Sequence, residues 1–540
     1  MAVLEDQKKQ FEALVLMHVP FVFRVETRPN KEAYSDLTSK KKYTYLELNR
    51  QINKLSHALK NEGVGHGDVV MSCLMNSVDG VILNYASWKI GAIYSPINFR
   101  FAPGDIAYCL KDSEPRVFVY DGEIAGTAGQ GIEMSEFKVR KAMSASGLEE
   151  YASGHPDVEP PAPEGMSPFE EGLRLYTSGT TGRPKGVPHS HADMYIAGLS
   201  HSLYGMHWTP SDNILVIAPY FHAAGNVPSY MPALSLGMKV VSMKQFDPGK
   251  ALDAVEEEKL TFLMGPPTAF EAILKTLQEG CRRDTGTWKA AMLMGAPIPT
   301  RLYRALRDQL GIGVFNGDGN TEVLYCHTLS PWDSVEKWEG GATAKNGTAL
   351  PGNLIRVVKK YPDRKAEPDE LVPRDGETTG EMIVKNLHYP GGYHNLPEKS
   401  VQVFRNGWYY TGDSVTWDED GYNHIVGRTD DMIISGGENI FPEEVEARIM
   451  EMGGVEDCIV VGIPDEQWGE LVCAYIVRKD PSLTAGDVDL HLKNHRELAK
   501  YKRPRKYVFA DSLPFTATGK KQRFMIRRMA LEDLGTEGSA

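Results

Sequence analysis

Between residues 42 and 112 the sequence alternates helix-like segments with short apolar runs. The segment YTYLELNRQINKLSHALKNEG (43–63) has apolar residues at helical spacing and ends on Gly63. The run DVVMSCLM (68–75) has the length and apolarity of a buried strand, and VDGVILNYASWKIGAIYSPIN (78–98) repeats the order of helix and strand. This alternation predicts an α/β domain whose strands are mainly parallel.

The chain has 540 residues, far more than one compact domain needs, and its pattern changes along its length. A connector rich in Pro and Glu (154–172) is followed by further α/β units, and short strands and turns then dominate residues 345–428. A compact mixture of helices and strands comes after them. We therefore predict an α/β fold. Its large N-terminal domain (1–428) consists of layered α/β subdomains plus a β-rich subdomain, and a small α+β C-terminal domain follows (429–540).

Charge and cysteine usage disfavour several classes of function. The formal net charge of −13 argues against a general nucleic-acid-binding protein. The six cysteines lie far apart without a CxxC pair, which disfavours a disulfide framework and a zinc site and predicts a cytoplasmic protein. No run of about 18 apolar residues occurs, and no apolar run follows a basic start, so we expect neither a membrane span nor a secretory signal.

The segment YTSGTTGRPKG (176–186) is suited to contact a polyphosphate. Its glycines allow the backbone to bend tightly and to approach a ligand closely. Hydroxyl groups, backbone N–H groups and the Lys185 ammonium supply the short donors and positive charge that phosphates prefer. The segment is not a Walker A loop, because no GK(S/T) ends it. Taken alone, such a run is also compatible with an ordinary surface loop.

This order of residues resembles the signature loop of the adenylate-forming superfamily of acyl-CoA synthetases, adenylation domains and luciferases, (S/T)SG(S/T)TGxPKG. Further matches follow in the family's order: PYFHAAG (219–225), MGAPIP (294–299), NGDGNTE (316–322), GWYYTGD (407–413), GRTDDMIISGGENIFPEEVE (427–446) and LPFTATGKKQR (513–523). Because the matches span nearly the whole chain, it is identified as a member of this superfamily.

The resemblance implies an ATP site. The implied ATP- or AMP-binding residues are Thr177, Ser178, Gly179, Thr180, Thr181, Gly182, Lys185, Gly295, Ala296, Pro297, Asp318, Asp413 and Arg428. In the family, the backbone at 295–297 lies along adenine, and Asp413 accepts hydrogen bonds from both ribose hydroxyls. Asp318 departs from the family, which usually has a Tyr that stacks on adenine there. A carboxylate cannot stack, and Gly317 and Gly319 leave room that we assign to the acyl pocket.

The family's catalytic roles fall on four residues of this chain. An aromatic or His side chain borders the carboxylate pocket, and His222 matches it. Thr321 is expected to contact phosphate, and Glu322 to hold the Mg²⁺ that bridges ATP oxygens, since this ion prefers hard oxygen ligands. Lys520 is expected to stabilise the charge that develops between the carboxylate and the α-phosphate. No protein nucleophile is implied.

A second set of residues implies coenzyme A. In the family the small domain is mobile and rotates about a hinge, which falls at Asp430, and Gly436 and Gly437 match the glycines that line the pantetheine channel. The segments PDEQWGE and YKRPR (501–505) resemble those of halobenzoate-CoA ligases, where a Trp and an aromatic residue flank the adenine of coenzyme A and basic residues meet its phosphates. The matching residues are Trp468, Tyr501, Arg503 and Arg505.

Together these parts predict an AMP-forming acid–CoA ligase. The enzyme would activate a carboxylic acid with ATP to acyl-AMP, release pyrophosphate, and pass the acyl group to coenzyme A with release of AMP. ATP, Mg²⁺ and coenzyme A are the implied cofactors and co-substrates. The expected acid is an aryl or medium-chain monocarboxylate, the latter as in fatty acid metabolism. A homodimer is an expectation from the family.

Other interpretations remain open from the sequence. An enzyme of this kind could instead load the phosphopantetheine of a carrier protein. The same fold could serve a luciferase-like oxygenation or a non-catalytic nucleotide sensor, because fold alone does not fix function. Asp318 favours the sensor, whereas Lys520, Glu322 and Asp413 together favour an enzyme.

Overall fold

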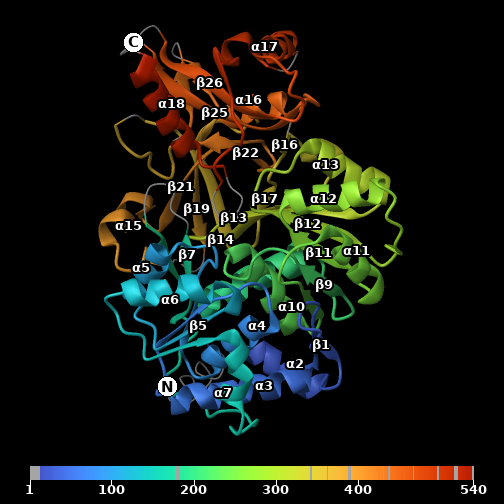
Figure 1. Ribbon diagram of the computed structural model, residues 1–540, viewed down its shortest axis with the longest axis vertical. Coiled ribbons are helices and arrows are strands. Elements are labelled where there is room, and N and C mark those ends of the chain that lie inside the picture. The colour runs from blue at the N-terminus through green and yellow to red at the C-terminus, as the bar shows by residue number, and fades with distance from the viewer. Residues whose placement is uncertain are drawn as a thin grey trace.

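The computed structural model describes residues 12–177, 183–340, 343–361, 363–386, 391–429, 431–435, 438–465, 468–495, 498–515 and 521–537. Figure 1 shows an elongated molecule in which the orange and red C-terminal elements lie together at one end. The order of helices and strands confirms the predicted mixed α/β class. Among the helices described, none is long and apolar enough to cross a membrane. The six cysteines are free thiols, of which all but Cys281 are buried.

The first part of the chain forms a six-stranded sheet with the order β6-β5-β3-β4-β7-β8. Its strands are β3 (Val69–Cys73), β4 (Ile93–Pro96), β5 (Val117–Tyr120), β6 (Lys141–Ser144), β7 (Glu171–Thr177) and β8 (Lys185–Ser190). Neighbours are parallel except β7 and β8. The helices α3 (Tyr45–Asn61) and α4 (Val78–Lys89) confirm the two predicted from periodicity, and a Thr44–Glu47 capping box begins α3.

A nine-stranded sheet with the order β17-β14-β13-β12-β11-β9-β10-β1-β2 follows. Its strands are β1 (Glu32–Asp36), β2 (Lys42–Thr44), β9 (Asn213–Val216), β10 (Lys239–Ser242), β11 (Phe262–Gly265), β12 (Ala290–Met294), β13 (Gly313–Asn320), β14 (Leu324–Leu329) and β17 (Thr348–Ala349). From β13 through β9 to β10 the neighbours are parallel, whereas β13 and β14 form an antiparallel hairpin. The carboxyl ends of β9, β11, β12 and β13 therefore share one edge.

Helices cover these two sheets (Figure 1). They are α2 (Val19–Thr27), α5 (Pro103–Ser113), α6 (Ala125–Met134), α7 (Leu148–Ala152), α8 (His191–Leu199), α9 (Ala223–Gly225), α10 (Met231–Leu236), α11 (Pro248–Glu257), α12 (Pro267–Gln278), α13 (Thr300–Arg304) and α14 (Val335–Trp338), together with the π-helical turns η3 (Ser200–Gly205) and η4 (Asn226–Tyr230).

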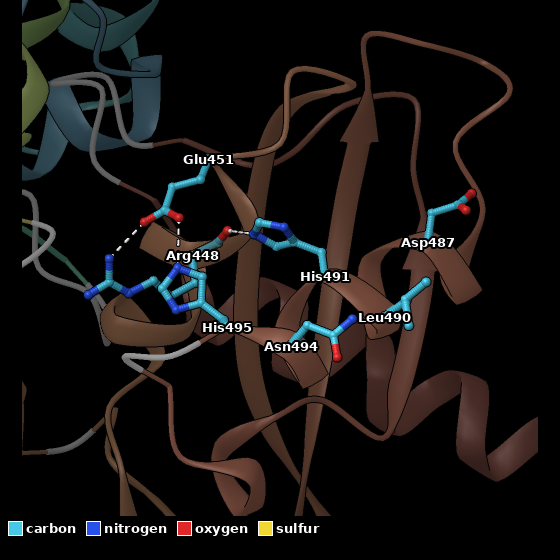
Figure 2. A pocket seen from close by; sticks show the side chains of 7 residues that line it. All are labelled: Arg448, Glu451, Asp487, Leu490, His491, Asn494 and His495. Atoms are coloured by element: carbon cyan, nitrogen blue, oxygen red, sulfur yellow. Dashed lines mark hydrogen bonds and ion pairs between the residues drawn. The ribbon is translucent and has the colours of Figure 1, made fainter.

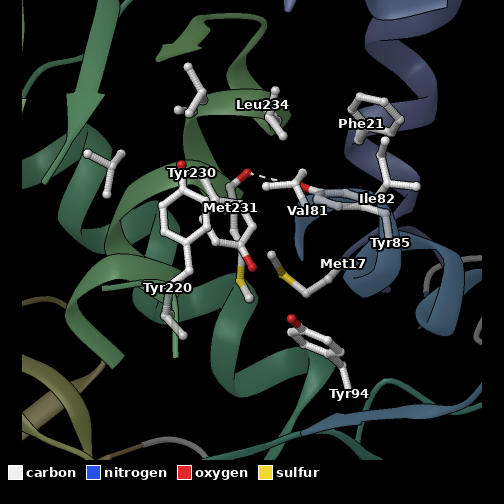
Figure 3. Close-up of a cluster of buried hydrophobic side chains, with 14 of the residues drawn as sticks. Met17, Phe21, Val81, Ile82, Tyr85, Tyr94, Tyr220, Tyr230, Met231 and Leu234 are labelled. Carbon is white, nitrogen blue, oxygen red and sulfur yellow. Dashed lines mark hydrogen bonds between the residues drawn. The ribbon is translucent and has the colours of Figure 1, made fainter. Parts of the chain in front are cut away.

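The largest hydrophobic core joins α2 and α4 to η4 and α10, as Figure 3 shows. In it the Tyr85 hydroxyl donates to the Met231 carbonyl at 3.5 Å, and the ring of Tyr220 packs on Tyr230 with centroids 4.7 Å apart. The Tyr220 N–H also donates to the Asn76 side chain at 2.8 Å. Because Tyr220 belongs to the PYFHAAG segment, the core fixes the position of that segment.

The C-terminal half contains two further sheets. The third has the order β18-β19-β21-β20 with β22 beside β21, and the fourth has the order β24-β23-β26-β25 with β27 beside β26. Their elements, with the small β15–β16 pair, are β15 (Glu339–Gly340), β16 (Thr343–Ala344), β18 (Asn353–Val358), β19 (Gly380–Asn386), α15 (Pro397–Val403), β20 (Phe404–Arg405), β21 (Trp408–Trp417), β22 (Asn423–Arg428), β23 (Ile433–Ser435), β24 (Glu438–Ile440), α16 (Pro442–Ile449), β25 (Val455–Asp465), β26 (Gly469–Arg478), α17 (Ala485–Asn494), β27 (Lys506–Phe509) and α18 (Arg523–Glu537).

The strand β22 of the third sheet lies against the start of α16, a helix that packs on β25 of the fourth sheet. A Cβ built on Gly427 would lie 2.7 Å from Glu443 Oε2 and 2.9 Å from the Phe441 ring, so only glycine permits this close approach. The predicted domain boundary at 428/429 falls directly after β22 and stays a prediction.

Candidate active site

The carboxyl edge of the second sheet gathers several predicted residues. His222 follows β9, and Gly295 follows β12. Met264 lies near the end of β11, and Asp318 lies near the end of β13. Ligands of open α/β sheets bind in the crevice outside the carboxyl ends of their strands. The candidate active site is therefore expected at this edge of the sheet.

The His222 turn is tightly built. His222 is the N-cap of α9, and its Nδ1 accepts from the Ala224 N–H at 3.3 Å. A Cβ on Gly225 would lie 2.2 Å from the Pro219 carbonyl oxygen and 2.5 Å from that of Ala218, so no side chain fits there. The glycine in this motif is thus required by packing, and it holds the half-buried His222 in one place.

The turn between β13 and β14 carries Thr321 and Glu322. A Cβ on Gly319 would lie 1.8 Å from the Leu324 carbonyl oxygen, and Leu324 itself has a φ of +56°. The expectation that Gly319 leaves room for the acyl group is therefore wrong, because this glycine allows the two strands of the hairpin to meet. The Asn320 side chain accepts from the Val323 N–H at 3.2 Å and closes the turn.

Tyr393 links Lys185 to Glu322. The Tyr393 hydroxyl donates to Glu322 Oε1 at 2.7 Å and lies 3.3 Å from Lys185 Nζ, which also sits 4.4 Å from the centre of the Tyr393 ring. Burial lowers the pKa of Lys185 against the attraction of Glu322, and burial together with that carboxylate raises the pKa of Tyr393 well above its ordinary value. The end of the phosphate-loop segment and the predicted metal carboxylate are therefore brought together.

Tyr393 was not predicted, because GGYHN (391–395) matches none of the motifs. Its segment is anchored to β8, where the His394 N–H donates to the Gly186 carbonyl at 2.8 Å. The link that Tyr393 makes between Lys185 and Glu322 becomes visible only when the third sheet packs against β8. No local pattern in the sequence predicts it.

Asp413 and Arg428 lie opposite one another on β21 and β22. Arg428 donates to Asp413 Oδ1 at 2.6 Å and to the Thr411 carbonyl at 2.9 Å. The sequence motifs at 407–413 and 427–446 thus supply a carboxylate and a guanidinium that form an ion pair. Arg428 is also close enough to Lys185 to oppose its protonation.

Asp318 takes part in a network of side chains. Its Oδ2 receives hydrogen bonds from His327 Nε2 at 3.0 Å and from Asn346 Nδ2 at 2.7 Å, and Asn346 Oδ1 accepts from the Ile425 N–H at 2.9 Å. Burial acts to lower the pKa of His327, but Cys326 and Asp318 outweigh it and raise that pKa to about 10. The carboxylate that replaces the family's aromatic ring is therefore paired with a buried histidine. Its contact with adenine stays a prediction.

The predicted adenine segment is open. Gly295 has a φ of +81° with no atom within 4 Å of a Cβ position, and Ala296 and Pro297 are exposed. Thr177, at the end of β7, has a buried hydroxyl oxygen with no hydrogen-bond partner within the described residues. Both features suit a ligand. Several predicted residues lie outside the described residues: Ser178, Gly179, Thr180, Thr181, Gly182, Asp430, Gly436, Gly437 and Lys520.

Comparison with known protein families decides the identity of the site. The model of the AMP-binding enzyme family matches residues 21–394, and that of the AMP-binding enzyme C-terminal domain matches residues 444–520. The chain belongs to the AMP-binding enzyme family.

Individual relatives agree with this family. Feruloyl-CoA synthase of Amycolatopsis sp is 34% identical over 489 residues, which cover 90% of this chain and 93% of the relative. The 3-hydroxybenzoate–CoA ligase of Aromatoleum sp. (strain CIB) is 30% identical over 501 residues, covering 90% and 91%. ATP-bound MatB from Rhodopseudomonas palustris has a TM-score of 0.83 at 28% identity, covering 95% and 98%. The predicted superfamily, fold class and enzyme class, an AMP-forming acid–CoA ligase, are confirmed.

The coenzyme A candidates of this AMP-binding enzyme lie at one end of the fourth sheet. The strands β26 and β27 are parallel, with Cys473 opposite Lys506, so Trp468 and Tyr501 both precede the paired region on the same side. The two side chains are 43% and 44% exposed. Arg503 is held by Asp489 of α17 at 2.5 Å, whereas Arg505 is exposed.

The C-terminal elements of the AMP-binding enzyme also carry a surface hollow, which lies between α16 and α17 (Figure 2). Glu451, His491 and His495 approach one another there with ligand atoms within 4.8 Å. His495 pairs with Glu451 at 2.8 Å, His491 Nε2 bonds to the Arg448 carbonyl at 3.0 Å, and the Arg448 guanidinium binds the other oxygen of Glu451 at 2.7 Å. These contacts join the two helices, and the adjacent guanidinium disfavours a second cation.

Proposed function

We propose that this AMP-binding enzyme converts an aryl carboxylic acid to its coenzyme A thioester in two half-reactions at one site. The observation that supports it best is the chain of contacts Lys185–Tyr393–Glu322, which gathers a cation, an orienting hydroxyl and a carboxylate from three separate segments. The Asp413–Arg428 pair lies on adjacent strands of the third sheet.

In the first half-reaction a carboxylate oxygen attacks the α-phosphorus of ATP, and the bond to pyrophosphate breaks. Two anions must meet, so the site has to supply positive charge fixed in advance. Lys185 is attracted by Glu322, and Arg428 lies near enough to influence both Lys185 and Tyr393, so both cations can supply such charge. We assign Lys520 to the developing charge between carboxylate and phosphate, and His222 to the border of the acid pocket. Holding the acid in line supplies much of the remaining acceleration.

Glu322 fits the Mg²⁺ that ATP brings. Tyr393 donates to one of its carboxylate oxygens, and no described residue donates to the other. When bound there, the ion would neutralise charge on the phosphate oxygens. Tyr393 would hold the carboxylate in a fixed orientation, and Thr321 in the same turn would contact phosphate.

In the second half-reaction the thiol of coenzyme A loses its proton, its sulfur attacks the acyl carbon, and AMP leaves with the electron pair of the broken bond. We assign Trp468 and Tyr501 to the two faces of the coenzyme's adenine, because both rings are exposed at the same end of the sheet. Arg505 is the basic residue available for phosphate, and Arg503 would have to leave Asp489 first. Rotation about Asp430 and passage of the pantetheine beside Gly436 and Gly437 complete this proposal.

The aryl class of the acid is supported by the relatives. By their names, one forms feruloyl-CoA and another acts on 3-hydroxybenzoate. The side chains packed closest around Gly317 are those of Met292, Tyr325 and His201, and flat or adaptable side chains of this kind suit a ring. The cytoplasmic location and a homodimer stay predictions.

Pyrophosphate release tests the proposal. The purified chain is assayed with ATP, Mg²⁺ and a panel of benzoates, cinnamates and alkanoates, with and without coenzyme A. Aryl-dependent release and a thioester product are expected. Release without a thioester would point to a carrier-protein acceptor, and no release with any carboxylate would overturn the enzyme assignment. Lys520→Ala should depress adenylation while sparing thioester formation from supplied acyl-AMP. An equal loss in both steps would contradict the role of Lys520.

A further inference from the structure

His201, in the π-helical turn η3, is a fully buried polar residue without a partner. Within the described residues, neither of its ring nitrogens has a hydrogen-bond partner. Its ring instead packs edge-on against Tyr325 at 4.9 Å and against Trp208 at 6.5 Å between centroids. Trp208 is also buried, and its indole N–H likewise has no partner there. Two neighbouring side chains therefore hold unsatisfied polar atoms in one place.

Unsatisfied buried polar atoms are costly, and native proteins keep few of them. A neutral imidazole has one donor and one acceptor, and the indole adds a further donor. Burial lowers the pKa of His201 to about 3, so the ring is neutral at physiological pH. The pair thus presents unused donors and an acceptor, without a charge, among apolar neighbours. π-Helical turns of this kind often occur at functional sites.

The position of His201 relates it to the acid pocket. A Cβ built on Gly317 would lie 3.3 Å from His201 Nε2, 2.7 Å from Tyr325 Cε1 and 2.1 Å from Met292 Cε. Gly317 lies opposite Met294 on β12, one residue before the Gly295 turn at the carboxyl edge. His201 therefore lies beside Gly317, one of the two glycines assigned to the acyl pocket from the sequence. The flexible Met292 thioether is the group that fills the space between them.

We propose that His201, assisted by Trp208, forms the distal end of the acid-binding site and hydrogen-bonds a hydroxyl substituent on the ring of an aryl acid. A hydroxyl both donates and accepts, which matches the imidazole acceptor and the imidazole or indole donor. A second carboxylate is disfavoured, because the neighbours Met292, Tyr325 and Trp208 carry no positive charge. This inference rests on the proposed function and names the class of acid within it.

The test compares matched acids in the pyrophosphate-release assay. The ratio of kcat/KM for 3-hydroxy- or 4-hydroxybenzoate to that for benzoate is measured with the wild type, His201→Phe, His201→Asn and Trp208→Phe. We expect the wild type to prefer a hydroxylated acid at least about tenfold, since a site built for a hydroxyl rejects the analogue that lacks it. His201→Phe should bring this ratio to about one, whatever its effect on the rate with benzoate, and His201→Asn should restore part of the preference.

Two controls separate this inference from its alternatives. Tyr204→Phe changes an exposed residue of the same turn and should leave the ratio unchanged. In urea unfolding, His201→Phe should be as stable as the wild type or more stable, because it removes two unpaired polar atoms. A clear loss of stability, with benzoate and hydroxybenzoate activity falling equally, would show a structural role and overturn the inference. An unchanged ratio in His201→Phe would also overturn it.

The outcome for the proposed function is read from the wild type alone. Activity with alkanoates but with no aryl acid would overturn the aryl assignment and the inference together. Activity with aryl acids at equal kcat/KM for both members of each pair would overturn the inference and leave the aryl assignment in place.

Discussion

At the scale of single residues, the hydrogen bond of the Tyr393 hydroxyl leads to a specific prediction for adenylation. Tyr393→Phe removes the hydrogen bond to Glu322 and leaves the ring under Lys185. A hydrogen bond to a charged group contributes about 1.5–3 kcal/mol, so adenylation should slow about 10- to 100-fold, with a higher Mg²⁺ concentration needed for half-maximal rate. Pyrophosphate release measured across a Mg²⁺ series checks this. Tyr361→Phe, which breaks a similar bond to Glu370, is the matched control, and identical Mg²⁺ curves for both variants would refute the role.

The pairing of Asp318 with His327 leads to a second prediction at this scale, which concerns the free energy of unfolding. Asp318→Asn removes the negative partner of the buried His327, which should lower the free energy of unfolding at pH 7 by about 1.5–3 kcal/mol, the contribution of a hydrogen bond to a charged group. The folded pKa of His327, about 10, exceeds its ordinary value of 6.5, so the stabilisation is complete below pH 6.5 and is lost as the pH rises to 10. Urea unfolding between pH 6 and 10 should show this decline in the wild type and in the exposed control Asp369→Asn. A decline of the same slope in Asp318→Asn would contradict the pairing.

At the scale of elements, the β13–β14 hairpin depends on Gly319. Gly319→Ala would place a methyl group against the Leu324 carbonyl oxygen, which belongs to the backbone and cannot rotate away. The turn that holds Thr321 and Glu322 should shift, with adenylation falling more than about 100-fold, since displacement of catalytic groups by about 1 Å has costs of this size. Circular dichroism and pyrophosphate release measure the two effects. Gly129→Ala, in open space on α6, should instead stabilise the chain by about 0.5–1 kcal/mol. Full activity in Gly319→Ala would disprove the argument.

At the scale of the whole molecule, the contact between β22 and α16 should depend on pH. Burial, opposed by Arg523 and reinforced by Glu446 and Asp431, raises the pKa of Glu443 to about 7. Because this folded value exceeds the ordinary 4.5, the contribution of Glu443 to the packed state is complete below pH 4.5 and is lost as the pH rises to 7.

Hydrogen exchange of the β22 amides, corrected for the intrinsic pH dependence, checks this expectation. Exchange around Gly427 should become faster relative to the rest of the chain between pH 5 and 8. The effect should disappear in Glu443→Gln and persist in Glu444→Gln, which changes a neighbour paired with Lys502. Equal behaviour of the two variants would rule out Glu443 as the titrating group.

The sequence predicted those parts of the molecule that depend on local pattern. Periodicity placed α3, β3 and α4, and motif order nominated Lys185, Glu322, Asp413 and Arg428 as candidates, because each motif is a short run of neighbouring residues. Tyr393 and His201 were not predicted, since their significance comes from contacts with residues 71 or more positions away, Glu322 for one and Gly317 for the other. Gly319 was misassigned because a sequence shows the absence of a side chain but not which atom occupies the space.

The single half-buried thiol has a practical consequence for measuring distances within the chain in solution. Five cysteines are buried, and Cys281, shortly after α12, is left as the accessible position. Thiol labelling depends on access, so a maleimide dye should attach there in the unaltered chain. A second cysteine at an exposed site of α17, such as Leu490→Cys, would accept a partner dye. Energy transfer between the two dyes would then test the predicted rotation about Asp430, since a change in the separation of α12 and α17 when substrates are added would alter its efficiency.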